Sequence, residues 1–142
     1  MTAEEPKAIL GLDVGSKRIG IAVATAEARL PGPLCTLENT AAFWDKLAVL
    51  VQEHGVEALV VGLPRSLEGN DTAQTREART FMARLRANTG LPVYEQDEAA
   101  TSIQAEAELT SRGRPYRRGD IDALAATYIL DDFLQSQRSS GA

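Results

Sequence analysis

The first part of the chain alternates short apolar runs with polar turns. Residues 7–14 and 18–24 are mostly apolar, and a Gly-Ser-Lys turn separates them. Apolar runs of this length, bounded by turn residues, are typical of buried strands. A third strand is expected over residues 33–37, after a Pro-Gly-Pro turn. Together these segments predict an antiparallel meander of three strands.

Helical spacing of apolar residues begins after the meander and predicts four helices. They cover residues 41–54, from Asp71 to about 88, 101–112, and 120 to about 134. Each begins beside a residue type that caps helices well, and a glycine follows each of the first three. The expected caps are Asn39 or Thr40, Asp71 with Gln74, Thr101 with Gln104, and Asp120, and the terminating glycines are Gly55, Gly90 and Gly113.

Two more strands are expected between these helices. Residues 58–62 are apolar without alternation, as in a parallel strand that is covered on both faces, and residues 91–95 form another short strand. The order βββαβαβαα predicts an α/β fold. Its mixed central sheet would join the antiparallel meander to parallel strands, with helices on both faces. One domain over residues 1–142 is expected, with a flexible tail over about 135–142.

Composition is that of an ordinary soluble domain. The 142 residues are 44% apolar and 25% charged, close to the globular average. No apolar run approaches the ~18 residues of a membrane span, and the acidic N-terminus lacks the apolar core of a signal peptide. The single cysteine, Cys35, cannot form an internal disulfide. These features predict a cytoplasmic protein that does not enter membranes.

The net charge of -5 argues against a protein that coats nucleic acid with a broad basic face. It is compatible with a nucleic-acid enzyme, because an active site made of carboxylates is itself acidic. Basic residues are also concentrated locally, in a segment that contains Arg112, Arg114, Arg117 and Arg118.

Acidic residues stand at three places where strands are expected to end or helices to begin. Asp13 ends the first strand, Asp97 and Glu98 follow the strand over 91–95, and Asp120 and Asp122 open the last helix. A carboxylate among apolar residues is costly unless something pairs with it, such as a metal ion. For Asp13 the alternative is a plain turn, and for the Asp97-Glu98 pair it is a turn after a strand.

Asp122 differs from Asp120 in the direction it is expected to face. On a helix, position 122 begins the stripe formed by Ala125, Ala126, Ile129 and Phe133, so its side chain should point into the protein. A favourable charge at a helix N-terminus explains Asp120 as a cap, but it does not require Asp122 to face inward. An inward carboxylate again calls for a partner.

The residue types favour a particular metal. Oxygen ligands without paired histidine or cysteine suit Mg²⁺ or Mn²⁺ and do not suit zinc. The lone His54 stands near a helix end, where surface or helix-terminal charge explains it. Cys35 has no evident catalytic partner, and neither a Gly-x-Ser-x-Gly elbow nor a Gly-x-x-x-x-Gly-Lys loop is present.

Four segments of the chain resemble the YqgF family, also called RuvX, of the RNase H-like superfamily. The family's motifs occur here in the same order and at the same spacing, and they cover nearly the whole chain. The matching segments are Leu12-Asp-Val-Gly-Ser-Lys-Arg-Ile-Gly-Ile-Ala-Val23, Val60-Val-Gly-Leu-Pro64, Asp97-Glu98 with Thr101-Ser102, and Asp122-Ala-Leu-Ala-Ala126 leading into Tyr128-Ile-Leu130.

This resemblance implies an RNase H-like fold and a nuclease that uses two metal ions, Mg²⁺ or Mn²⁺. It places Asp13, Glu98 and Asp122 on the superfamily's catalytic, metal-binding acids. The implied reaction is processing of the 5′ end of precursor 16S rRNA in ribosome biogenesis. The family commonly has Arg directly after the Asp-Glu pair, whereas this chain has Ala99, so the interaction of that Arg is either missing or supplied by another residue.

Nucleic acid is therefore the expected partner, RNA or possibly DNA. Lys17 and Arg18 stand beside Asp13 and could hold a substrate phosphate, although a solvated turn explains them equally well. The basic segment could bind along the phosphate backbone of a nucleic-acid strand, with a solvated loop as the alternative; its arginines are Arg112, Arg114, Arg117 and Arg118.

Three other functions stay open at this point. One is a nuclease that resolves Holliday junctions in DNA, which would favour a homodimer over a monomer. Another is a non-catalytic nucleic-acid-binding assembly factor. The third is an actin-like or sugar-kinase ATPase, whose fold begins with a phosphate-binding hairpin of similar sequence, Asp-x-Gly-[Ser/Thr]. Such proteins normally need a second domain with its own hairpin.

Overall fold

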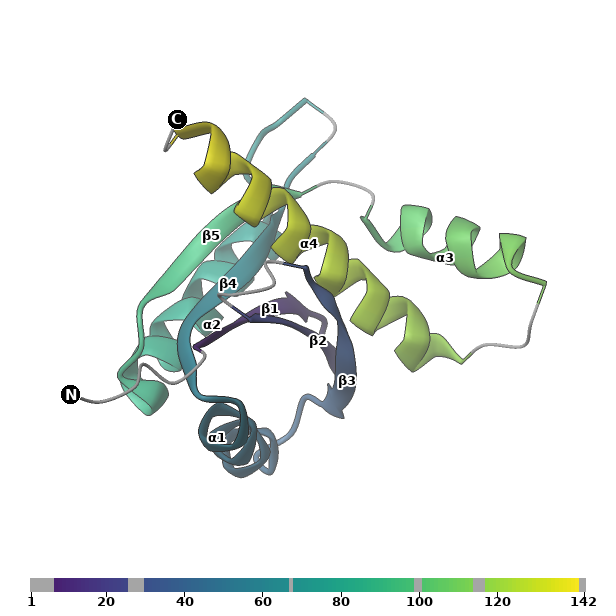
Figure 1. Ribbon diagram of the computed structural model, residues 1–142. Helices are drawn as coiled ribbons and strands as arrows, with labels where there is room; N and C mark the ends of the chain where they lie inside the picture. Colours follow the sequence, from purple (N-terminus) through teal and green to yellow (C-terminus); the bar gives the residue numbers. More distant parts are fainter. Residues whose placement is uncertain (1–6, 26–29, 67, 99–100, 114–116, 141–142) are drawn as a thin grey trace.

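The computed structural model describes residues 7–25, 30–66, 68–98, 101–113 and 117–140, without the side chains of 98, 101–104, 106 and 138–140. The elements follow the predicted order (Figure 1). They are β1 (Ala8–Val14), β2 (Arg18–Thr25), β3 (Gly32–Glu38), α1 (Phe43–His54), β4 (Val56–Pro64), α2 (Ala73–Thr89), β5 (Val93–Glu98), α3 (Thr101–Ser111) and α4 (Arg118–Ser140).

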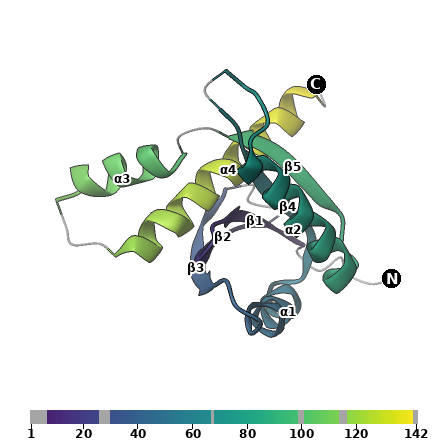
Figure 2. The ribbon, with the colours of Figure 1, turned by 180° about the vertical axis from the view of Figure 1, so that it is seen from behind.

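The strands form one sheet in the order β3-β2-β1-β4-β5. The strands β1, β2 and β3 pair antiparallel, and β4 lies parallel to both β1 and β5. Helix α4 crosses one face of the sheet (Figure 1), and α1 and α2 cover the other (Figure 2). The mixed sheet with helices on both faces is therefore confirmed.

Apolar residues fill both sides of this sheet. The larger cluster lies under α1 and α2, where Leu10, Leu12, Leu59 and Val61 are fully buried. A second cluster joins the opposite face to α4 and contains Ile129, Leu130 and Phe133 of that helix. The unalternated run over residues 58–62 is thus explained, because β4 is covered on both faces.

Two glycines let α4 lie unusually close to the sheet. A Cβ added at Gly20 of β2 would stand 2.0 Å from the backbone oxygen of Asp122, and one at Gly11 of β1 would stand 2.8 Å from the Cβ of Leu130. No side chain larger than hydrogen fits at Gly20 unless the backbone of α4 moves. The start of α4 is also held by Thr36 of β3, whose Oγ1 donates to the carbonyl of Gly119 at 2.6 Å.

Helix α3 packs against α4 through a third apolar cluster that includes Leu109, Leu124 and Ala125. At the edge of this cluster the Tyr128 hydroxyl donates to Glu108, which also pairs with Arg112. The hydrogen bond from Tyr128 lowers the pKa of Glu108. Burial, with Glu108 as the next cause, raises the pKa of Tyr128 to about 12.

Several helix ends differ from the sequence-based expectation. Thr72 caps α2 in a capping box with Thr75, because Asp71 is drawn into ion pairs with Arg65 and Arg79 instead. Ala42 occupies the N-cap of α1 without a side-chain bond. Helix α4 begins at Arg118 and continues through the tail segment 135–140, which was expected to be flexible.

The terminating glycines were predicted correctly for α1 and α2. Gly55 and Gly90 both adopt left-handed backbone conformations as C-caps. Gly113 is also left-handed, two residues after the end of α3. The expected cap of α3, Thr101 with Gln104, involves side chains outside the described part of the structure. In the described part of the chain, no helix carries an apolar stretch long enough to cross a bilayer.

Replacing Gly20 by alanine is expected to lower the free energy of unfolding by about 1–3 kcal/mol or more, because the new methyl meets the backbone of Asp122. Urea denaturation measures this. Gly32→Ala is the matched control, since nothing lies within 4 Å of a Cβ built there. Equal stability of the two variants would contradict the close approach of α4.

Removing the Tyr128 hydroxyl tests how α3 is fastened. Because the pKa of Glu108 is lowered in the folded state, its carboxylate stabilises the fold above about pH 4.3. This contribution to the free energy of unfolding disappears as acid protonates Glu108 in the folded protein. The contribution of Tyr128 is present below about pH 10 and disappears as the pH rises through about 12.

Tyr128→Phe should therefore lower stability near pH 7 by about 1 kcal/mol or less, since the site is partly exposed. The difference from wild type should shrink at both pH extremes when urea denaturation is repeated across pH. Tyr94→Phe serves as the control, and a difference that does not change with pH would speak against the bond.

Candidate functional site

The parallel strands β1, β4 and β5 end at the same edge of the sheet. Asp13 stands one residue before the end of β1, and Glu98 is the last residue of β5, paired with Pro64 of β4. Asp97 and Glu98 thus belong to the strand itself, although they were expected to follow it. The shared edge brings the backbone positions of Asp13 and Glu98 to one end of the molecule.

Strand alternation separates the two neighbouring acids of β5. Position 97 pairs with Leu63, which is buried on the α1 and α2 side, whereas position 96 pairs with Gly62 and position 94 with Val60 on the α4 side. The ring contact between Tyr94 and Phe133 of α4 fits this assignment. Position 98 has the parity of 94 and 96, and its side chain is outside the described part of the structure.

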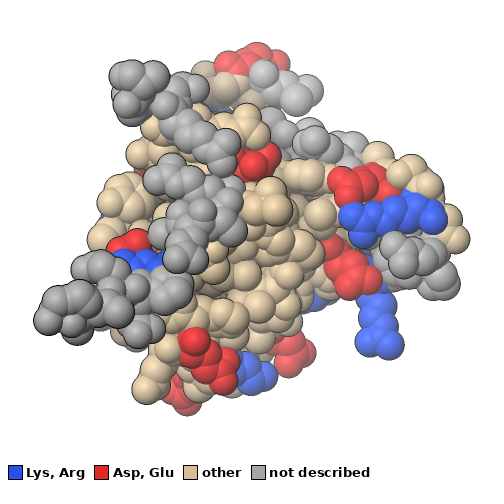
Figure 3. All heavy atoms as spheres, in the orientation of Figure 1, with Lys and Arg blue, Asp and Glu red and all other residues tan. Residues whose placement is uncertain are grey.

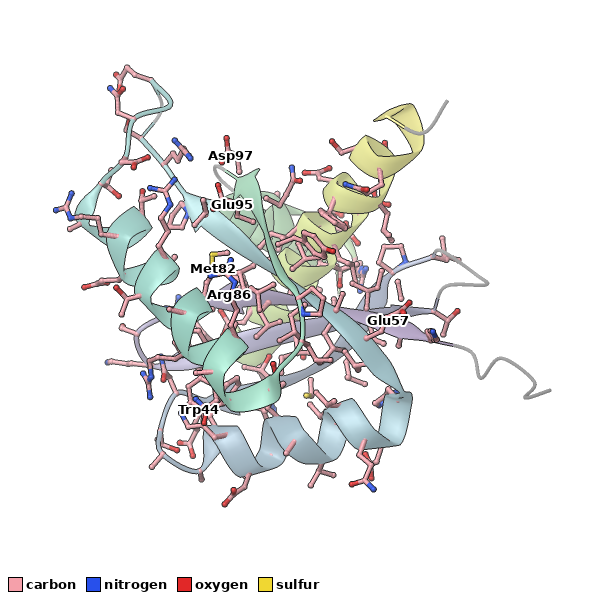
Figure 4. All side chains as sticks on the ribbon, turned by 90° about the vertical axis from the view of Figure 1, so that its left-hand side faces the viewer. Trp44, Glu57, Met82, Arg86, Glu95 and Asp97 are labelled. Atoms are coloured by element: carbon pink, nitrogen blue, oxygen red, sulfur yellow. The ribbon has the colours of Figure 1, made fainter. Side chains whose placement is uncertain are left out.

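Asp97 is bound on that opposite side. Its Oδ1 accepts from Arg65 Nε at 3.0 Å, and Arg65 also pairs with Asp71, which in turn pairs with Arg79. Figure 4 shows Glu95 and Asp97 at the upper end of β5. These ion pairs tie the loop after β4 to the end of β5, so Asp97 has a structural partner and lies on the face away from α4.

Asp13 and Asp122 both lie beside Gly20. Asp13 pairs directly with Gly20 across β1 and β2, and directly paired residues share a face of the sheet. The backbone of Asp122 lies against the same glycine. The side chain of Asp122 is only 18% exposed, so the expected inward direction of this residue is confirmed. One strand position and one helix turn therefore bring two of the three predicted acids together.

Arg18 contacts the carboxylate of Asp122. Its Nε donates to Oδ2 at 2.6 Å, and the two residues are 104 positions apart in the chain. From the sequence, Arg18 was assigned to a substrate phosphate, and this ion pair was not expected. No local pattern could reveal it, because it depends on where α4 crosses β2.

The oxygen-donor chemistry of this edge fits Mg²⁺ or Mn²⁺, which prefer carboxylates. Asp122 has one carboxylate oxygen on Arg18, and no described residue bonds the other. Among the side chains that the structure describes, no group of three or more histidine, cysteine, aspartate or glutamate residues is assembled to hold a metal. The predicted third ligand, Glu98, has no described side chain.

Asp120 has a different role from Asp122. Its Oδ2 accepts from the backbone N–H of Arg117 at 2.9 Å, which closes the turn that begins α4. It was expected to be the N-cap, but it lies inside the first turn and bonds backward. This contact assigns Asp120 to the helix start.

Apart from Arg18, the basic residues named from the sequence are exposed, paired with an acid, or outside the described residues. Lys17 is exposed in the β1–β2 turn, which Asn39 holds by donating from Nδ2 to the carbonyl of Gly15 at 2.8 Å. Arg117 and Arg118 are exposed at the start of α4, and Arg112 is paired with Glu108. Arg114 lies outside the described residues, as does Ala99.

Positive and negative side chains lie side by side near α3 and the start of α4. Figure 3 shows Lys and Arg next to Asp and Glu on that side of the molecule. The described surface in this view is therefore mixed in charge.

The cysteine and histidine do not contribute to this edge. Cys35 packs against the cluster under α1 and α2, and burial raises the pKa of its thiol, which disfavours the nucleophilic thiolate. His54 is the last residue of α1.

Comparison with known proteins agrees with the fold. The Thermus thermophilus RuvC in complex with a Holliday junction substrate is similar with a TM-score of 0.58 and 18% identity, over 94% of this chain and 97% of that one. A Fowlpox virus resolvase in complex with Holliday junction DNA is similar with a TM-score of 0.50 and 10% identity, over 92% and 98%. At these identities the likeness supports the fold alone, and it confirms the RNase H-like expectation.

Relatives in sequence share a larger fraction of residues. A protein of Moorella thermoacetica named "Putative pre-16S rRNA nuclease" is 41% identical over 94% of this chain and 98% of its own length. One of Azotobacter vinelandii with the same name is 36% identical over 96% and 98%. The family model described as "RuvX: Holliday junction resolvase" matches residues 7–136. The chain therefore belongs to the RuvX family.

Proposed function

We propose that this protein is a metal-dependent nuclease that hydrolyses phosphodiester bonds, and that its substrate is the 5′ end of precursor 16S rRNA. The observation that carries the proposal is the placement of both Asp13 and Asp122 beside Gly20, at the sheet edge where β5 ends in Glu98. Family membership and the names of the sequence relatives support the reaction and the substrate.

In this proposal Asp13, Glu98 and Asp122 would hold the divalent ions. Mg²⁺ or Mn²⁺ bound there would supply an activated water and stabilise the leaving oxygen. The protein's own contribution is geometric. Gly20 fixes how close Asp122 comes to the sheet, and β-strand pairing fixes Asp13 and the backbone of Glu98. Asp97 and Asp120 are not assigned as ligands in this proposal, because Asp97 lies on the face of β5 away from α4 and Asp120 closes the turn that begins α4.

Exposed basic residues around the start of α4 are proposed to bind the phosphates of the substrate strand. Lys17, Arg117 and Arg118 are exposed near this end of the helix, and Arg114 belongs to the same stretch of sequence. Arg112 is the weakest member, since its guanidinium already pairs with Glu108. Phosphate contacts of this kind position a strand without reading its sequence.

Resolution of Holliday junctions is the second candidate function. The family description names this reaction. The same acids would serve both reactions, so the substrate decides between them. Junction cleavage requires two active sites and thus a dimer, whereas processing of an RNA end can be carried out by a monomer.

Asp13→Asn should reduce Mg²⁺-dependent cleavage of precursor 16S rRNA by roughly 10²–10³-fold or more, because a charge that stabilises the reaction is removed. The fold should persist, as judged by circular dichroism. Asp97→Asn is the control, since that carboxylate lies on the other face of β5. Full activity in Asp13→Asn would exclude this site.

Cleavage of a synthetic Holliday junction by the same protein separates the two candidate functions. Cleavage of the junction alone, by a dimer in solution, would favour resolution. Cleavage of the RNA precursor alone would favour processing.

Arg117→Ala with Arg118→Ala should weaken binding of a single-stranded RNA and flatten its salt dependence. The slope of log K against log salt is expected to fall by about 0.7 for each phosphate that the variant no longer binds. Fluorescence anisotropy in EDTA measures binding without cleavage. Lys46→Ala, on exposed α1, is the control. An unchanged slope in the double variant would remove this segment from the binding surface.

A further inference from the structure

Arg18 contacts Asp122 through one nitrogen of its guanidinium. Its Nε donates a hydrogen bond to Oδ2 of Asp122 at 2.6 Å. Among the described residues, none accepts a hydrogen bond from either terminal nitrogen of Arg18. The side chain of Arg18 is 36% exposed, twice the fraction of Asp122. One edge of the guanidinium therefore faces the acid, and no described side chain occupies its terminal nitrogens.

The backbone of Asp122 is already fixed by its surroundings. Its carbonyl lies against Gly20, and Thr36 holds the preceding turn through Gly119. What remains to be set is the rotation of the carboxylate about its side-chain bonds. The Nε contact sets it, and it leaves Oδ1 without a partner among the described residues. A carboxylate held by one oxygen presents the other in a constant direction, and metal ligands are commonly oriented by hydrogen bonds of this kind.

We propose that Arg18 is a positioning residue of the active site, which orients Asp122 through Nε and offers its terminal nitrogens to a phosphate oxygen of the substrate. This inference rests on the proposed function, in which Asp122 is a metal ligand. Arginine suits the double role because its donors form a rigid planar fork, whereas a lysine ammonium is a point charge.

Arg18→Lys keeps the charge and removes the planar Nε contact. Mn²⁺ serves as the probe, with affinity measured by calorimetry on the protein without substrate. Residues that orient metal ligands typically change metal affinity by 10–100-fold, so Arg18→Lys should weaken Mn²⁺ binding about 10-fold or more. Arg65→Lys, which alters the ion pairs of Asp97 on the other face, is the matched control and should leave Mn²⁺ affinity unchanged.

A double-mutant cycle separates orientation from a general loss of structure. If Arg18 acts through Asp122, Arg18→Lys should have no further effect on Mn²⁺ affinity in an Asp122→Asn background. Equal additional losses in both backgrounds would overturn the inference. Thermal unfolding of each variant checks that the fold is retained.

Binding of single-stranded RNA tests whether the terminal nitrogens of Arg18 contact a substrate phosphate. In EDTA, Arg18→Ala should lower the salt slope for single-stranded RNA by about 0.7, the value for one phosphate. An unchanged slope would overturn the phosphate contact.

The failures of the two proposals can be told apart. Equal or tighter Mn²⁺ binding by Arg18→Lys, with binding abolished in Asp13→Asn, would overturn the role of Arg18 alone. Equal binding would mean that the Nε contact does not orient a metal ligand, and tighter binding would mean that the guanidinium competes with the ion. Mn²⁺ affinity and cleavage that persist in both Asp13→Asn and Asp122→Asn would overturn the proposed function, and this inference with it.

Discussion

The contact between α4 and the sheet is the constraint on which the rest of the site depends. Side chains usually hold packed layers well apart, and two stacked sheets, for example, lie about 10 Å from each other. At Gly20 and Gly11 side chains are absent, so the backbone of α4 reaches the strands themselves. The buried Ala126 continues this close approach along the helix. A carboxylate at position 122 thereby joins one that belongs to the sheet.

Bringing two carboxylates to one place has an electrostatic cost. Like charges repel when no cation lies near them. Arg18 supplies a positive charge that belongs to the protein itself and lies against one of these carboxylates. The chain thus carries both the acids and part of the charge that holds them together before any ion or substrate arrives.

Local patterns predicted most of the fold. Apolar runs identified all five strands, and helical spacing identified all four helices within the described segments. The helix caps were harder, because Asp71 has the right residue type but is used by two arginines that come from elsewhere. Asp97 and Glu98 were expected to follow the strand, yet pairing with β4 extends β5 through both of them, and the bond from Arg65 holds Asp97.

The candidate acids were found from position and resemblance, and the structure adds how they meet. Asp122 was expected to face inward because it begins an apolar stripe, and it does. The Arg18 contact could not be found in this way, because it joins a strand start to a helix start 104 residues apart. The role of Glu98 as the third metal-binding acid stays a prediction.

The alternation of β5 has a consequence for how the chain can tolerate insertions and deletions. Moving this strand by one residue would exchange the faces of positions 97 and 98 and turn Asp97 toward α4. Arg65 on Asp97 and Arg79 near Glu95 hold the strand from the α2 side at two alternate positions. A slipped strand would break both pairs at once. The exposed ion pairs favour the observed register, so an insertion or deletion that shifts β5 by one residue would lose both of them.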